Sequence, residues 1–190
     1  HMWIFAKFIS NNNCFCYTFE PNKAYARFYD NITNHTLISK AAYIYDGTIE
    51  MNMDRNQGGF GSSIIKEKKD RCMGQLDRKN PDIVECVAFS KWIKDNCNES
   101  DNIILKMDIE GSEYDIIEKM IKEGTIKYIN KLFIEWHNTK LDMPNITERH
   151  NLLVDNLKKT DIIIDDTWCA IKYSTTYKQS PYYGKQWDEL

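Results

Sequence analysis

The stretch NIILKMDIEGSEYDIIEKMI, residues 102–121, joins a short apolar run to an amphipathic pattern through an acidic turn. The run 102–109 predicts a buried strand. The apolar positions that follow it recur at helical spacing: Ile116, Ile117, Met120 and Ile121. Ser112 is suited to cap this helix and Gly124 to end it. A buried strand followed directly by a helix is the repeating unit of a parallel α/β sheet.

The same alternation of strands and helices extends along the chain and predicts an α/β fold with a mostly parallel sheet and helices on both faces. Further strands are expected at 14–20, 37–47 (one strand or a pair, closing in a hairpin turn at Asp46-Gly47), 48–54, 83–89, 129–137, 161–166 and 168–177. Further helices are expected at 2–10, 21–32, 90–97 with Ser90 as its cap, and 147–159 with Thr147 as its cap.

Length and charge restrict the class of protein. The 190 residues suit a single domain spanning 1–190, and a net charge of −3 gives no basic field for nucleic acid or an anionic membrane. We expect neither kind of partner, and the Lys-rich segment 66–70 is expected to be solvated. The six cysteines form no CxxC pair and no Cys/His cluster with zinc-site spacing, so no zinc site of that kind is expected and no residue is assigned as a metal ligand. Without a signal peptide or an apolar span, a cytoplasmic protein is expected.

Three of the predicted strands end in potentially reactive side chains. The first ends at Glu20, the second at Asp108 and Glu110, and the third at Glu135 and His137. Ligands of open α/β sheets bind outside the carboxyl ends of the strands. These side chains are therefore expected at one site, with Asp108 and Glu110 on the same face because side chains alternate along a strand.

Each of these residues has more than one interpretation. Glu20 could accept hydrogen bonds from a ribose diol or merely favour the helix start that follows it. Glu113 is explained mainly by the helix dipole. Asp108 and Glu110 could bind a metal, orient a substrate hydroxyl or act as a base, and His137 could deprotonate a hydroxyl. The loop GGFGSS, 58–63, could approach a ligand closely.

In this order, several stretches resemble the FkbM family of S-adenosylmethionine-dependent methyltransferases. The matching stretches are YTFEPNKAYARFYDNI, AAYIYDGTIEMNM, GSSI, LKMDIEGSEYDIIEKM and KLFIEWH. The resemblance implies a Rossmann-like class I methyltransferase fold with S-adenosylmethionine as cofactor. It also implies cofactor-binding roles for Glu20 at the ribose, for Asn22, and for Ala42 and Asp46 near the adenine. Asp108 and Glu110 would face cofactor and substrate, with Glu135 and His137 beside them, and these four are the expected catalytic residues.

The family's first strand and its glycine-rich cofactor loop should come directly before residues 3–10. Only His1 and Met2 stand there, so the domain is expected to be incomplete at its N-terminus. The missing strand would lie between the strands that end at Glu20 and Asp108. Either the chain is part of a longer one, or another chain supplies the strand.

Three functions are compatible with these observations. The first is O-methylation of a hydroxyl on a sugar, a glycan or a small metabolite, as the resemblance implies. The second is a non-catalytic binding module derived from a methyltransferase, which the missing glycine-rich loop favours. The third is a metal-dependent hydrolase that uses the same carboxylates, which the FEPN stretch argues against.

Overall fold

A computed structural model describes residues 14–55, 59, 61–70 and 75–166. The helix predicted at 2–10 and the strand predicted at 168–177 lie outside these residues. Among the helices of the described part, none is both long and apolar enough to cross a bilayer.

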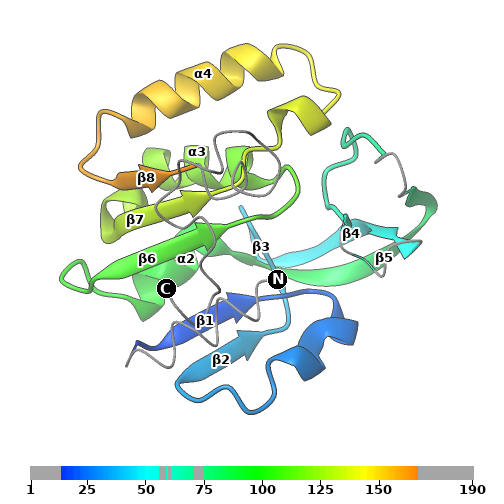
Figure 1. Ribbon diagram of the computed structural model, residues 1–190, viewed down its shortest axis with the longest axis horizontal. Helices are drawn as coiled ribbons and strands as arrows, with labels where there is room; N and C mark the ends of the chain where they lie inside the picture. The colour runs from blue at the N-terminus through cyan, green and yellow to red at the C-terminus, as the bar shows by residue number, and fades with distance from the viewer. Residues whose placement is uncertain (1–13, 56–58, 60, 71–74, 167–190) are drawn as a thin grey trace, which may run out of the picture.

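The described residues form short strands that alternate with helices (Figure 1). The strands are β1 (Cys16–Phe19), β2 (His35–Ile38), β3 (Ala41–Tyr43), β4 (Gly47–Asp54), β5 (Leu76–Ala88), β6 (Ile103–Met107), β7 (Ile129–Ile134) and β8 (Ile163–Asp165). The α-helices are α2 (Phe89–Asn96), α3 (Glu113–Glu123) and α4 (Ile146–Leu157), and the 3-10 helices are η1 (Lys23–Phe28), η3 (Thr125–Tyr128) and η4 (Asn138–Lys140).

Parallel pairing dominates, which confirms the predicted mixed α/β character. β1 pairs with β2, and β7 pairs with both β6 and β8, all in parallel. Figure 1 shows the arrows of β1, β2, β6 and β7 pointing the same way. Within the described residues, β1 is hydrogen-bonded only to β2 and β6 only to β7. A further strand between β1 and β6 therefore stays a prediction.

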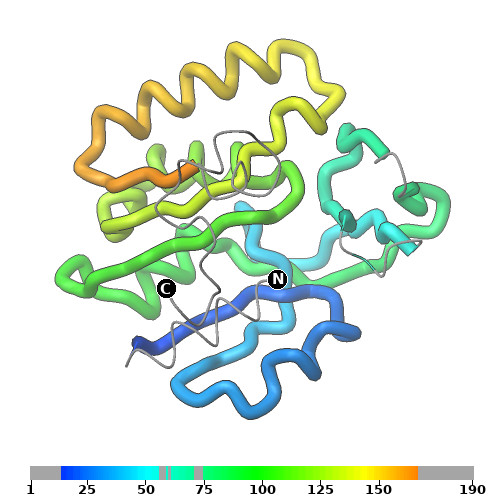
Figure 2. The backbone as a smooth tube through the Cα atoms, in the orientation of Figure 1, coloured from blue at the N-terminus to red at the C-terminus, as the bar shows by residue number. Residues whose placement is uncertain are grey.

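The hairpin predicted at Asp46-Gly47 is wrong. β3 and β4 flank this turn but do not pair with each other, because β5 lies between them, parallel to β3 and antiparallel to β4. The Asp46 carboxylate accepts a hydrogen bond from the Ala88 N–H at 3.0 Å. The turn signal predicted that β3 pairs with β4. In the structure β3 pairs with β5 instead, a strand from later in the chain. Figure 2 shows the backbone of this β4–β5 region extending to one side of β6 and β7.

Two helix starts and one strand start also differ from expectation. Helix α2 begins after Ala88, and the predicted cap Ser90 is buried inside it, with its hydroxyl 2.6 Å from the Thr125 hydroxyl. Helix α4 is preceded by Asn145 instead of Thr147. Strand β5 begins at Leu76 despite its polar residues, because Arg55 beside it pairs with Asp77 and Asp82. Helix ends are the part of a fold that local signals define least well.

The core lies between the helices and the β6–β7 strands, and it positions the polar strand ends. Ile116, Ile117 and Met120 of α3 are fully or almost fully buried, as their spacing predicted. They join Leu132 and Ile134 of β7 in one apolar cluster. Gly124 ends α3 in the left-handed conformation at φ 72°, also as predicted.

Candidate functional site

The chain turns sharply where β6 ends. The strand stops at Met107, and Glu110 and Gly111 adopt positive φ angles of 55° and 116°. Strand alternation therefore does not place Asp108 and Glu110 on one face, and that part of the prediction is wrong. The two side chains still come together, because both approach the ring of His137. A left-handed turn brings about the proximity that an extended strand was expected to provide.

Glu113 contacts His137 on the Nδ1 side of the ring, opposite the other carboxylates. Both side chains are fully buried. Glu113 Oε1 accepts a hydrogen bond from the His137 backbone N–H at 2.8 Å and lies 3.1 Å from His137 Nδ1. Glu113 Oε2 accepts a hydrogen bond from the Gly111 N–H at 2.9 Å. Glu113 thus joins the ends of β6 and β7, a role beyond the helix-dipole effect expected from the sequence.

The other side of the His137 ring faces carboxylates. Nε2 lies 3.4 Å from Glu110 Oε2, 3.6 Å from Glu135 Oε1 and 4.0 Å from Asp108 Oδ1. Burial disfavours the charged imidazole, but the Glu113 hydrogen bond and the charges of Glu113 and Glu110 outweigh it, so the His137 pKa is raised. The four predicted catalytic residues are therefore brought together around one ring.

Lysines balance part of this negative charge. Lys68 Nζ lies 2.6 Å from Glu110 Oε2, and the Lys68 side chain is only 1% exposed. Lys106 Nζ lies 3.4 Å from Asp108 Oδ2, and Lys140 Nζ lies 2.9 Å from Glu135 Oε1. Burial raises the pKa of Asp108, but Lys106 and His137 outweigh it and hold that pKa below its ordinary value. The prediction that the segment 66–70 is solvated is wrong for Lys68.

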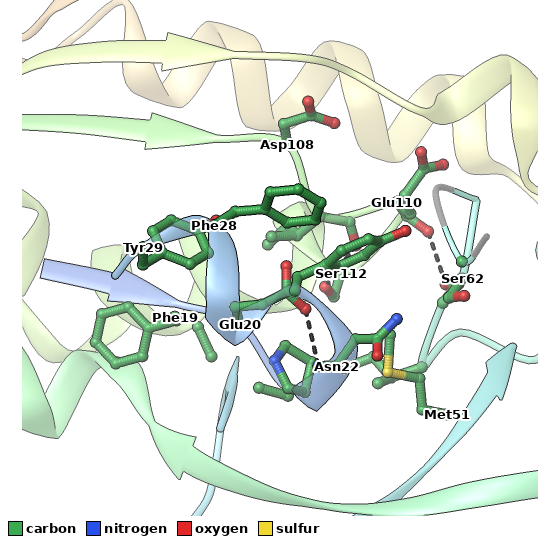
Figure 3. Close-up of a pocket in the computed structure, with 18 residues that line it drawn as sticks. Phe19, Glu20, Asn22, Phe28, Tyr29, Met51, Ser62, Asp108, Glu110 and Ser112 are labelled. Atoms are coloured by element: carbon green, nitrogen blue, oxygen red, sulfur yellow. Dashed lines mark hydrogen bonds between the residues drawn. The ribbon is translucent and has the colours of Figure 1, made fainter. Parts of the chain in front are cut away.

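A cavity of about 250 Å³ lies between this cluster and the end of β1. Its lining includes three of the predicted cofactor residues besides Asp108: Glu20, Asn22 and Ala42. Figure 3 shows Glu20 in the middle of the lining and Asp108 toward one end, with Phe28 and Tyr29 drawn between them. Asp46, Glu135 and His137 are not among the lining residues. Asp46 is thus separated from the other predicted cofactor residues.

Glu20 is positioned by its neighbours on both sides. Phe19 packs edge-to-face against Phe89 and Trp92 of α2, which fixes the end of β1. The Asn22 N–H donates a 2.8 Å hydrogen bond to Glu20 Oε1. Burial raises the pKa of Glu20 to about 7, against the smaller opposing effect of this hydrogen bond. The carboxylate is therefore poorly solvated and gains from any ligand that donates hydrogen bonds to it.

The glycine-rich loop contributes to the same cavity through Gly59, Ser62 and Ser63. Gly59 has a φ of 93°, and a Cβ placed on it would lie 2.7 Å from the side-chain nitrogen Nδ2 of Asn22. The Ser63 hydroxyl donates to the Glu110 carbonyl at 2.7 Å. This hydrogen bond connects the loop to the turn after β6. The sequence of the loop gave only a weak indication that it lies at a ligand site.

Sequence reasoning missed several residues of the site. Lys68 carries no local signal, because a lysine in a charged segment normally lies in water. The aromatic residues Tyr25, Phe28 and Tyr29 were detectable, since their spacing places them on one side of a helical segment. Trp136, by contrast, lies as expected away from the carboxylates, where it packs against Tyr114 and His150.

Parallel strands with a cavity at their carboxyl ends, lined by an acidic residue after β1, define an α/β protein whose cavity lies where open sheets of this class bind their ligands. The family model described as the methyltransferase FkbM domain matches residues 4–160. The chain therefore belongs to the FkbM methyltransferase family. A search of curated proteins and a search of solved structures each found no match.

Proposed function

We propose that this chain uses S-adenosylmethionine to methylate a hydroxyl group of a sugar, a glycan or a small metabolite. One observation carries the proposal: the partly buried Glu20 carboxylate and the Asp108–Glu110 pair line the same cavity. The fold that best accounts for this arrangement is the Rossmann-like class I methyltransferase fold, with a further strand between β1 and β6.

The lining residues fit the cofactor. In its ionised form Glu20 accepts hydrogen bonds, as a ribose diol requires, and its partial burial reduces its contact with water. Ala42, Met51 and Ile64 supply apolar surface for a purine ring, and Phe28 and Tyr29 supply aromatic surface. When bound, S-adenosylmethionine supplies an electrophilic methyl group on its sulfonium sulfur.

Asp108 is the residue of the cluster best placed to meet the substrate hydroxyl. It lines the cavity, and its side chain is 29% exposed, whereas the His137 side chain is fully buried and is not part of the lining. In this proposal the Asp108 carboxylate accepts the hydrogen bond of the hydroxyl and aligns its oxygen. The proton that the hydroxyl loses passes to the Asp108 carboxylate as the oxygen takes the methyl group, and Glu135 and His137 stand behind Asp108.

Isothermal titration of the full chain with S-adenosylmethionine tests the cofactor assignment. We expect saturable binding with Kd below about 1 mM. Glu20→Ala should weaken it by about 1–3 kcal/mol through loss of charged hydrogen bonds. Glu50→Gln is the matched control, since Glu50 pairs with Lys66 at the surface. Absence of binding would contradict the proposal and favour a non-catalytic module.

A second measurement tests the hydroxyl chemistry. The chain is incubated with labelled S-adenosylmethionine and a panel of sugars and hydroxylated metabolites, and methylated product is detected by mass spectrometry. Asp108→Asn should abolish most of the transfer while leaving cofactor affinity within about tenfold, because the variant removes a single charge at the cavity wall. Wild-type turnover by Asp108→Asn would remove Asp108 from the reaction.

A further inference from the structure

The Nε2 atom of His137 stands in an unusual environment. The side chain is fully buried, and within the part of the chain that the structure describes Nε2 makes no hydrogen bond. Oxygens of Asp108, Glu110 and Glu135 lie 3.4–4.0 Å from it. Buried polar atoms are normally satisfied, and this arrangement favours either a proton on Nε2 or a bound cation between the ring and these oxygens.

Glu113 determines how the ring presents this atom. A carboxylate only accepts hydrogen bonds, so the Nδ1 atom that faces Glu113 Oε1 at 3.1 Å carries the hydrogen. The lone pair of the neutral ring then lies on Nε2, directed at the carboxylates. Proteins orient metal-binding histidines in this way, with a carboxylate behind the ring and the metal in front of it.

We propose that Asp108, Glu110 and His137 bind one divalent transition-metal ion. Their ligand atoms, one oxygen from each carboxylate and one ring nitrogen, all lie within 4.8 Å of one another. Ligand bonds of about 2.0–2.2 Å place such atoms within roughly 4.4 Å of each other, so a contraction of a few tenths of an ångström suffices. Mixed imidazole and carboxylate ligands suit Mn²⁺ and Zn²⁺. Glu135 Oε1 lies 3.6 Å from the same ring nitrogen, but Glu135 is not one of the three residues whose ligand atoms lie together.

The neighbouring lysines are compatible with this site and limit its affinity. Lys106 contacts Asp108 Oδ2, whereas Oδ1 is the oxygen that approaches the His137 ring. Lys68 shares Glu110 with the ion, because its Nζ lies 2.6 Å from Glu110 Oε2. An ion at this site therefore competes with a lysine and with a proton on Nε2, so moderate affinity is expected.

The proposed site differs from the expectation of a metal-free protein. That expectation came from sequence spacing, which detects ligands close together along the chain. Here the ligands come from two segments that follow β6 and β7, and the second carboxylate reaches the ring only because of the turn at Glu110. No local motif records that geometry.

Titration with Mn²⁺, followed by electron paramagnetic resonance of the free ion, tests the site on the full chain after dialysis against a chelator. We expect one ion per chain with Kd of about 1–100 µM. Asp108→Asn should raise that Kd at least about tenfold, and the surface control Glu50→Gln should leave it unchanged. Absence of saturable binding, or equal binding by Asp108→Asn, would overturn the proposal.

Nitrogen NMR of the histidine rings distinguishes a metal from a proton on Nε2 in the wild-type chain, and a ligand variant serves only to assign the signals. The His137 signals are assigned by their loss in His137→Gln. At saturating Zn²⁺ we expect the Nε2 signal of His137 to shift while Nδ1 keeps its hydrogen. A hydrogen that persists on Nε2 would overturn the proposal. Neither measurement uses S-adenosylmethionine, so failure of the proposed methyl transfer would leave this result unaffected.

Discussion

Glu113 Oε1 contacts His137 at two points, the backbone N–H at 2.8 Å and the ring Nδ1 at 3.1 Å. One carboxylate oxygen thereby fixes both the chain direction after β7 and the orientation of the ring. Its second oxygen holds the Gly111 N–H, so the ends of β6 and β7 share a single buried side chain. The geometry of the acidic cluster depends on this helix residue, which does not itself line the cavity.

Glu113→Gln should destabilise the chain by about 1–3 kcal/mol, because the amide cannot reproduce charged hydrogen bonds to three buried groups. Urea unfolding measures the change. Glu118→Gln on the same helix is the control, since Glu118 pairs with Arg149 at the surface and should cost less than about 1 kcal/mol. Equal losses in the two variants would show that Glu113 contributes no more than a surface charge.

Lys68→Met should cost about 3–5 kcal/mol, because it removes the cation from the buried Glu110 carboxylate. The double variant Lys68→Met/Glu110→Gln should recover most of that loss, since neither charge is then buried. Unfolding in urea gives both values. Lys66→Met, whose lysine is 73% exposed, should change stability by less than about 1 kcal/mol. A double variant less stable than Lys68→Met would contradict the buried pair.

Glu20 should make stability depend on pH. Its pKa is about 7 in the folded chain and near 4.5 when unfolded, so the folded state keeps a proton that the unfolded state loses. The contribution of Glu20 to the free energy of unfolding of the wild-type chain should therefore fall by about 1–3 kcal/mol as the pH rises from about 4.5 to about 7. Glu20→Gln cannot titrate, so its stability relative to wild type should increase over that range. Parallel pH profiles of urea unfolding would contradict the burial of this carboxylate.

Gly111→Ala should destabilise the chain by about 1–3 kcal/mol, because the φ of 116° is unfavourable for alanine. The added Cβ would also lie 2.8 Å from Leu141 Cδ2, although that methyl group can move. Gly124→Ala is the matched control, with φ 72° and no atom within 4 Å of the added Cβ. It should cost only about 1–2 kcal/mol. Thermal unfolding of both variants checks the order.

The sequence predicted those parts of the fold that depend on local patterns. The strand before Asp108, helix α3 and the strand before Glu135 follow from their apolar spacing. The convergence of Asp108, Glu135 and His137 follows from the rule that parallel strands end at one edge of a sheet. Glu110 joins them only through the left-handed turn after β6, which that rule does not predict.

Features that depend on distant segments were not predictable. Asp46-Gly47 carries a hairpin signal, but a partner strand more than twenty residues later enters between β3 and β4. Lys68 is buried because Glu110 lies opposite it, and nothing within the segment 66–70 indicates that contact. An acidic residue is common in the first turn of a helix, where the helix dipole favours it. That local explanation accounted for Glu113, so its contact with His137 could not be inferred from the sequence.

The left-handed turn at Glu110 has a consequence for engineering the protein. A glutamate at φ 55° costs about 1–2 kcal/mol of backbone strain that glycine would not incur, and its side chain obliges a lysine to be buried as well. A combined Lys68→Met/Glu110→Gly change would remove both burdens at once. Selection for heat resistance alone would thus favour replacement of this buried Glu110–Lys68 pair.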